Sequence, residues 1–345
     1  MVDPICSHNA EDHETSASST RSCIHIGLAK TATKMLQKRL FRNHPGIKLF
    51  GFAYDCKRQR FLSRNGQVKS GLADLLDKQV KNADRSEMCA LMAKAVGRSK
   101  AANLVPLWSW ERLSLGVPGR RRARAQYLRD VIGPARIIVV LRHPVSLIES
   151  VYFQVIERYH IGAVTQSLWM RLKRPPWYPT FEQWVATAKP SQLLPVNHID
   201  YGRTIRFYEE CFGRENIHIL LFEQLEEDPE GFIRQLCSII GVDADEGVQL
   251  TSGRRDNDRW NLQQIRQLER ICGSFAASCR FRLSSYDQRK QLFNSSGGSE
   301  RDRVNKPAAD ISPEWKDRIE NLSREGNRYL VEHWKLPLDR YGYPV

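Results

Sequence analysis

The sequence predicts an α/β fold, a three-layer sandwich with a central parallel β-sheet flanked by helices. Short apolar runs alternate with segments of helical periodicity, an order typical of parallel βα units. The run ARIIVVLR (135–142) is apolar apart from its two arginines, as expected for a strand that is buried on both faces. With 345 residues, 41% of them hydrophobic and 27% charged, the chain has an ordinary globular composition.

We expect one domain over residues 22–345, with a disordered tail at 1–21 and an insertion at about 161–194 that is rich in tryptophan, proline and basic residues. The tail is polar and lacks the apolar core of an export signal. No apolar run reaches the roughly 18 residues that indicate a membrane span. The eight scattered cysteines lack the spacing of a zinc site and indicate reduced thiols. We therefore expect a cytoplasmic protein without stable membrane insertion. The sequence does not indicate an oligomeric state.

In the first part of the chain, strands are predicted from short apolar runs, and helices from apolar residues that recur every three or four positions. The expected elements are a strand at 23–29, a helix at 31–44, a loop from Tyr54 to Arg64, amphipathic helices at 72–80 and 88–96, and a strand at 101–108 with SWERL (109–113) at its carboxyl end.

The second part repeats the order of strand and helix. Gly241 ends one predicted helix, and the residues after Val242 form mixed polar segments. The expected elements are a helix that opens with the basic run Arg120 to Arg124, a strand at 135–142, a helix at 143–159, a strand at 217–225, a helix at 228–241 and a last helix from about Pro313 to Trp334.

The loop Lys30-Thr31-Ala32-Thr33-Lys34 lies between the first predicted strand and helix. The amino end of a helix presents unpaired backbone N–H groups and a partial positive charge, which together favour phosphate binding. Thr33 adds a hydroxyl donor, and the two lysines add charge. The pattern GxxxxGK[ST] is absent, which argues against ordinary ATP or GTP hydrolysis.

A second anion-binding pair is expected at the end of the strand 135–142. Arg142 ends this strand, and Ser150 stands eight positions later in the following helix. Arginine binds phosphate in a bidentate manner, and a serine two turns into the adjacent helix can reach the same anion. Without other context, Arg142 and Ser150 are equally consistent with surface residues.

The two motifs together resemble the sulfotransferase family. HIGLAKTATKMLQ resembles its 5′-phosphosulfate loop, usually written with Lys-Thr-Gly-Thr-Thr, and IIVVLRHPVSLIESVYF resembles its 3′-phosphate motif. Residues 200–243 and the Tyr-Gly-Tyr-Pro tail continue the resemblance. It implies a P-loop-like fold and a donor, 3′-phosphoadenosine 5′-phosphosulfate (PAPS), whose sulfuryl group is transferred to a hydroxyl or amine without a metal ion.

The resemblance also implies roles for individual residues. Lys30 would stabilise charge on the bridging oxygen of the donor; Thr31, Ala32, Thr33 and Lys34 would form the 5′-phosphosulfate cradle; Arg142 and Ser150 would bind the 3′-phosphate. Ala32 replaces the usual glycine and Lys34 the second threonine, so loop conformation and one hydroxyl donor differ from the family pattern.

Three residues compete for the role of catalytic base. Glu111 follows the strand 101–108, where the family tends to carry a Ser-Glu pair beside the acceptor, and Ser109 and Glu111 fill that place. Asp55 lies in the loop after the first helix, where some glycan sulfotransferases carry an acidic base. His44 is the third, and Glu111 is equally consistent with a carboxylate at a helix start.

The net charge of +14 favours anionic partners such as nucleotides and acidic glycans. We expect a carbohydrate, glycolipid or other small acceptor, with the insertion as a lid. A nucleic-acid-binding module would need a recognition motif, and none is present. A nucleotide kinase or other phosphoryl transferase would need Mg²⁺ and a lysine after glycine. A degenerate protein that binds PAPS without turnover is the remaining alternative.

Overall fold

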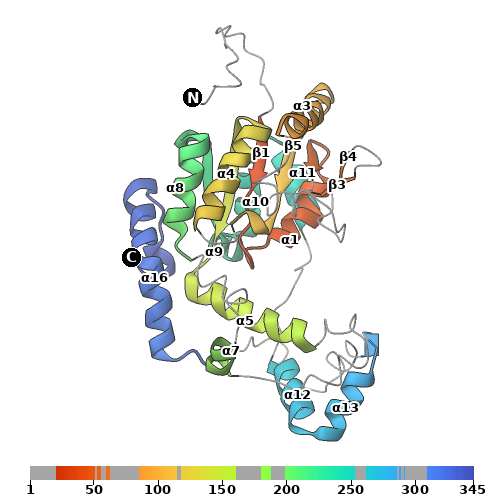
Figure 1. The fold of residues 1–345 in the computed structure, drawn as a ribbon, viewed down its shortest axis with the longest axis vertical. Helices are drawn as coiled ribbons and strands as arrows, with labels where there is room; N and C mark the ends of the chain where they lie inside the picture. The colour runs from red at the N-terminus through yellow and green to blue at the C-terminus, as the bar shows by residue number, and fades with distance from the viewer. Residues whose placement is uncertain are drawn as a thin grey trace.

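The computed structural model describes residues 21–50, 53–55, 60–62, 85–114, 118–160, 180–187, 199–252, 262–285, 287, 288, 291 and 309–345. The expected α/β fold is confirmed, with helices packed around a central sheet (Figure 1). The sheet has five parallel strands in the order β2-β5-β1-β6-β7. The strands are β1 (Ser22–His25), β2 (Ile47–Phe50), β5 (Val105–Ser109), β6 (Ala135–Leu141) and β7 (Ile217–Leu221). The chain winds to opposite sides of the central β1, and ligands of open α/β sheets bind at such a reversal, beyond the carboxyl ends of the strands.

Helices cover both faces of the sheet because successive side chains of each strand point to opposite faces. In β1, Ile24 packs into the core under α3, α4 and α8, whereas Cys23 packs into the core under η1, α10 and α11. These helices are α3 (Arg85–Ala101), α4 (Pro118–Ile132), α8 (Tyr201–Phe212), the π-helix η1 (Leu36–Phe41), α10 (Pro229–Ile240) and α11 (Ala244–Thr251). The result is the predicted three-layer sandwich.

A second, smaller core lies on the side of the strands' carboxyl ends. It joins residues of α5 (Pro144–His160), α7 (Phe181–Thr187), α12 (Leu262–Gly273) and α13 (Phe275–Leu283) (Figure 1). The long helix α16 (Pro313–Trp334) connects the two cores, since its Ile319 is buried in the small core and its Leu330 under the sheet. The bounds predicted for this last helix are confirmed.

Helices α8 and α16 approach each other closely at two glycines. A β-carbon added at Gly202 would lie 2.6 Å from the carbonyl oxygen of Gly326. The absence of a side chain at both positions therefore lets the two backbones touch, and it holds α16 against the edge of the main body.

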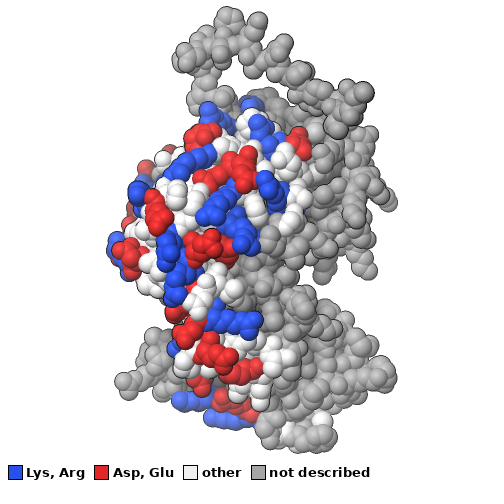
Figure 2. All heavy atoms as spheres, turned by 60° about the vertical axis from the view of Figure 1, so that its left-hand side comes forward, with Lys and Arg blue, Asp and Glu red and all other residues white. Residues whose placement is uncertain are grey.

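The face that carries α8 and α16 bears charges of both signs, which alternate over its surface (Figure 2). Arg122 pairs with Glu210 at 2.7 Å, and Arg203 pairs with Asp200 at 3.2 Å. The positive excess of the chain is thus not gathered on this face, in contrast to the basic stripe expected of a nucleic-acid-binding surface.

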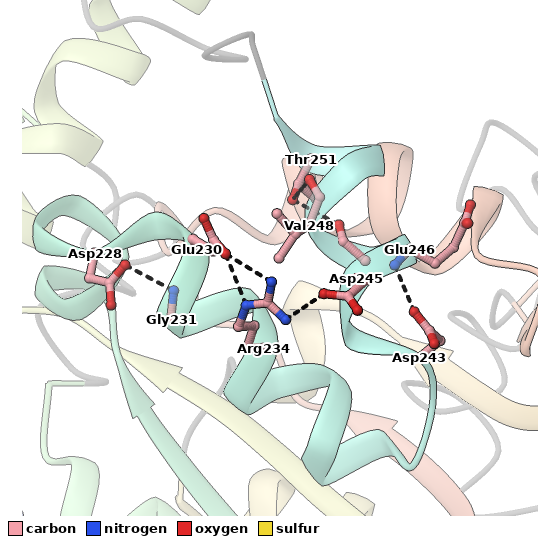
Figure 3. A network of polar contacts seen from close by, with 10 residues as sticks. Asp228, Glu230, Gly231, Arg234, Asp243, Asp245, Glu246, Val248 and Thr251 are labelled. Atoms are coloured by element: carbon pink, nitrogen blue, oxygen red, sulfur yellow. Dashed lines mark hydrogen bonds and ion pairs between the residues drawn. The ribbon is translucent and has the colours of Figure 1, made fainter.

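The corner between α10 and α11 is held by side-chain bonds at its surface (Figure 3). Asp228 caps α10 by accepting from Gly231 N at 2.9 Å, and Asp243 caps α11 by accepting from Glu246 N at 2.7 Å. Arg234 joins the two helices, because its guanidinium donates to both Glu230 and Asp245. The two caps satisfy backbone N–H groups at the starts of the helices, and the exposed Arg234 bridge adds a polar link between α10 and α11.

The structure corrects several sequence predictions. Strand β2 was missed, because IKLF is short and carries a lysine. The loop expected from Tyr54 to Arg64 contains two antiparallel strands, β3 (Ala53–Asp55) and β4 (Arg60–Leu62). The segments after Val242 include the helices α11, α12 and α13. The expected helix at 72–80, the tail up to residue 20, and the insertion apart from 180–187 lie outside the described residues.

The remaining elements are short and lie between the larger ones. They are α1 (Thr33–Met35), η2 (Glu111–Ser114), η5 (Arg214–Asn216), α9 (Phe222–Glu227) and η6 (Asp339–Tyr341).

Candidate active site

The loop between β1 and α1 has a backbone shaped to receive an anion. Lys30 and Ala32 both adopt the left-handed conformation, with φ of 64° and 60°, and Thr31 stands between them. Left-handed residues in alternation with ordinary ones turn successive N–H groups toward one concave side. The helix that begins at Thr33 adds the partial positive charge of its amino end. The predicted phosphate cradle thus has the backbone geometry that its role requires.

Three side chains hold the carbonyl groups of this loop. Thr31 and Thr33 both donate to the carbonyl of Leu28, at 2.9 and 3.3 Å, and Ser114 of η2 donates to the carbonyl of Gly27 at 2.9 Å. A β-carbon at Gly27 would lie 2.6 Å from the Thr33 hydroxyl, so any side chain at position 27 would displace Thr33. Because the two threonine hydroxyls are used inside the loop, an anion would meet backbone N–H groups first.

Arg142 contacts the loop directly. It follows β6, which is the neighbour of β1, and its Nη1 donates to the carbonyl of Lys30 at 2.9 Å. The guanidinium lies over the ring of Phe222, 4.4 Å from the centroid, and the carbonyl of Arg142 accepts from the Tyr201 hydroxyl at 2.6 Å. The structure therefore brings together the two predicted anion-binding motifs, 112 residues apart in sequence.

Ser150 and Lys34 occupy different surroundings on the helices that follow these motifs. Ser150 is buried in α5, the helix that starts directly after the Arg142 turn, and Lys34 is exposed in the first turn of α1. Lys34 thus offers a solvated charge beside the loop, in the place of the family's second threonine.

A buried polar network lies beneath the loop and was not predicted. His25 Nδ1 lies 2.7 Å from the Ser109 hydroxyl, which also accepts from the amide of Gln37 at 2.9 Å. These residues come from the ends of two paired strands, β1 and β5, and from η1. Ser109 is therefore an interior residue that ties the loop and its helix to β5. A histidine at the end of an apolar strand was the signal available in the sequence.

Burial lowers the pKa of His25 to about 4, because the fully buried imidazole would lose its hydration on becoming charged. The ring contacts Phe41 edge to face, with centroids 5.4 Å apart. His25 is thus neutral at physiological pH and acts as a fixed hydrogen-bonding group under the cradle.

The three predicted bases differ in position. Glu111 begins η2 directly beyond the carboxyl end of β5, next to β1, and is partly exposed. Asp55 ends β3, and its side chain lies outside the described part of the structure. His44 is buried at the amino end of the sheet. Its Nε2 lies 2.8 Å from the carbonyl oxygen of Asp243, and its Nδ1 accepts from Gly46 N at 3.0 Å. The structure does not bring His44 to the loop, so we omit it from the candidate site.

The basic run that opens α4 is partly internal, although a run of charged residues is usually a solvated face. Arg121 is 1% exposed, donates to the Thr204 hydroxyl and lies over the ring of Phe207, and Arg124 is also buried. Burial lowers the pKa of Arg121 from its ordinary value, although nearby Asp200 opposes this effect. The run therefore packs α4 against α8, and only part of it can contact a ligand.

Neither a metal site nor a membrane span stands out in the described residues. No three histidine, cysteine or carboxylate side chains among them come together as metal ligands. Within the same residues, no helix is both long and apolar enough to cross a bilayer.

Replacing Ala32 with glycine is expected to stabilise the folded protein by roughly 0.5–1 kcal/mol. An L-residue in the left-handed region costs about 1–2 kcal/mol, and the greater freedom of glycine in the unfolded chain offsets roughly 0.4–1 kcal/mol of the gain. Urea unfolding measures the difference. As a control, Ala93→Gly in the exposed interior of α3 should destabilise by about 1 kcal/mol. A loss of stability in Ala32→Gly would contradict the assigned loop conformation.

A comparison of the sequence with known protein families gives a match. A sequence model described as "Sulfotransferase family" matches residues 24–246, a range that includes the loop, the Arg142 turn and β7. No curated protein matches significantly.

Among solved structures, three similar chains are sulfotransferases. The sulfotransferase from Alicyclobacillus acidocaldarius is 18% identical, with 75% of this chain and 98% of that chain covered and a TM-score of 0.40. The sulfotransferase domain of the Synechococcus PCC 7002 olefin synthase is 12% identical, with 91% and 98% covered and a TM-score of 0.41. Mouse sulfotransferase SULT7A1, complexed with PAP, is 12% identical, with 90% and 85% covered and a TM-score of 0.36.

Proposed function

Because this chain belongs to the sulfotransferase family, we propose that it transfers a sulfuryl group from PAPS to a hydroxyl or amine of a carbohydrate, glycolipid or other small acceptor. The observation that carries this proposal is the contact between Arg142 and the loop at Lys30. It joins a cradle suited to the 5′-phosphosulfate with an arginine suited to a second phosphate, and PAPS carries both anionic groups. A nucleotide without a 3′-phosphate would use only the first.

At the donor end, backbone N–H groups of the loop would bind the 5′-phosphosulfate, with Lys34 adding charge at its rim. Lys30 would donate to the oxygen that bridges phosphorus and sulfur, because negative charge grows on that oxygen as its bond to sulfur breaks. Arg142 and Ser150 would bind the 3′-phosphate. The protein thereby supplies position and charge rather than covalent chemistry, as in phosphoryl transfer.

At the acceptor end, Glu111 would act as the general base. Its place beyond β5, beside the loop, supports this assignment over Asp55, the remaining alternative. As the acceptor oxygen forms its bond to sulfur, Glu111 would take the hydroxyl proton, while the bridging oxygen leaves with the nucleotide 3′-phosphoadenosine 5′-phosphate (PAP).

Calorimetry tests the donor assignment. We expect PAP to bind at least about tenfold more tightly than ADP, because a charge-assisted bond to the 3′-phosphate, which ADP lacks, contributes roughly 1.5 kcal/mol or more. The titrations are run with and without Mg²⁺. Equal or absent binding would refute the proposal, and Mg²⁺-dependent preference for ADP would indicate a phosphoryl transferase. Transfer of radiolabelled sulfate from PAPS into a cell extract then identifies the acceptor class.

A further inference from the structure

Besides Tyr201, which donates to the carbonyl of Arg142, the carboxylate of Glu223 braces the turn that carries Arg142. Glu223, in the first turn of α9, accepts from the backbone N–H of His143 through Oε1 at 2.8 Å. Its other oxygen, Oε2, accepts from the hydroxyl of Tyr343 at 2.8 Å. Glu223 thus links the residue after Arg142 to the C-terminal segment of the chain, 120 positions further on.

His143 and the C-terminal segment also contact each other directly. His143 Nε2 lies 2.9 Å from the carbonyl of Gly342, and its ring packs edge to face on Tyr343 with centroids 5.3 Å apart. Tyr343 is 3% exposed. On the far side, the carbonyl of Pro344 accepts from the fully buried Asn327 of α16 at 2.8 Å. The segment is therefore anchored to α16 while it supports the turn.

Two adjacent residues of α9, Phe222 and Glu223, restrain the side chain and the backbone of the Arg142 turn, respectively. Phe222 carries the stacked guanidinium, and Glu223 fixes the next peptide unit. Burial raises the pKa of Tyr343 far above its ordinary range, so its hydroxyl stays protonated and remains a donor to Glu223. None of these groups needs to touch a nucleotide in order to set the direction in which Arg142 points.

We propose that Glu223 and Tyr343 are positioning residues that determine selectivity for a 3′-phosphate, by fixing the turn from which Arg142 reaches the nucleotide. This inference rests on the proposed donor and extends it to residues outside the two binding motifs. An arginine that binds a phosphate through two bonds depends on orientation, so a loosened turn should weaken this contact while it leaves the 5′-cradle intact.

The test compares the dissociation constants of PAP and adenosine 5′-phosphate (AMP) in the full chain by calorimetry. In Tyr343→Phe, which keeps the ring and removes the bond to Glu223, we expect the affinity for PAP to fall by roughly tenfold. The affinity for AMP should change by less than about twofold, since AMP uses only the cradle. The ratio of the two affinities is the measured selectivity.

Three further variants distinguish a positioning role from general damage to the site. Glu223→Ala should lose the selectivity, whereas Glu223→Gln should retain most of it, because the amide oxygen accepts from His143 and the amide nitrogen can donate to Tyr343. Tyr341→Phe is the matched control, since it removes an exposed tyrosine bond to Glu227 from the same segment. It should leave the ratio unchanged.

The outcomes are distinguishable. If the wild-type protein does not prefer PAP to AMP, the proposed function fails. If it does, and both Tyr343→Phe and Glu223→Ala retain the full ratio, the positioning role is wrong. A parallel loss of affinity for PAP and AMP would also overturn it, because that pattern indicates damage to the whole site.

Discussion

Replacement of Lys30 with alanine is expected to lower the rate of sulfuryl transfer by about 10²–10³-fold, the usual cost of removing one group that stabilises transition-state charge. Affinity for PAP should fall far less, since the cradle binds through its backbone and Arg142 donates to the carbonyl of residue 30 rather than to its side chain. Alanine keeps a β-carbon, so the left-handed conformation is as restricted as before. Single-turnover transfer of radiolabelled sulfate measures the rate, and calorimetry with PAP measures affinity.

Lys38→Ala is the matched control for this experiment. Lys38 is exposed on η1, about one helical turn beyond the end of the loop, and its loss changes the net charge by the same amount. We expect its transfer rate to stay within about twofold of wild type, as for an exposed charge outside the site. Unchanged turnover in Lys30→Ala would remove Lys30 from its role, whereas an equal loss in both variants would point to long-range charge instead.

Acidification should destabilise the protein through His25 by about 2–3 kcal/mol between about pH 7.5 and about pH 4.5. The pKa of His25 is lowered from 6.5 to about 4, so the unfolded chain takes up a proton in a range where the folded protein does not. Stability is therefore complete above the unfolded pKa and is lost as the pH falls from 6.5 toward 4, at about 1.4 kcal/mol per unit of pKa difference. Urea unfolding at the two pH values measures the loss.

His25→Asn provides the comparison. Asparagine can bond Ser109 and does not titrate, so the variant should lose about 2–3 kcal/mol less than wild type over the same range. The pKa of His218 is also lowered, by burial and by Arg136, but His218 is present in both proteins and its contribution cancels in the difference. Equal acid destabilisation of the two proteins would show that His25 is not the residue responsible.

The fold was predictable where the sequence pattern is regular, and it was missed where short elements depend on tertiary contacts. The run 135–142 is apolar apart from its two arginines because β6 is covered on both faces, and it could be assigned as a strand without knowledge of the strands beside it. In contrast, β2 is four residues long and includes exposed Lys48, so only its pairing with β5 makes it a strand. From the sequence alone, Arg121 is expected at the surface, whereas in the structure it is buried where α4 packs against α8.

Part of the site could also be predicted, because regular sequence patterns mark where its strands end. The loop at Lys30 and the turn at Arg142 end neighbouring parallel strands, and such ends meet at one edge of the sheet. The network of His25 with Ser109 spans 84 positions, and the bond between Glu223 and Tyr343 spans 120. Neither pair has a local pattern, because hydrogen bonds between distant segments leave no periodic trace in sequence.

Because Gly342 and Tyr343 anchor the Arg142 turn, this turn can be completed only after the C-terminal segment has been synthesised. A growing polypeptide acquires the cradle and Arg142 early, but it lacks both partners of this turn until some 200 further residues have been added. Contacts of such long sequence separation form late and slowly. A product that ends before Gly342 should therefore have a loosened Arg142 turn and, if the proposed donor is correct, a weaker preference for a 3′-phosphorylated nucleotide.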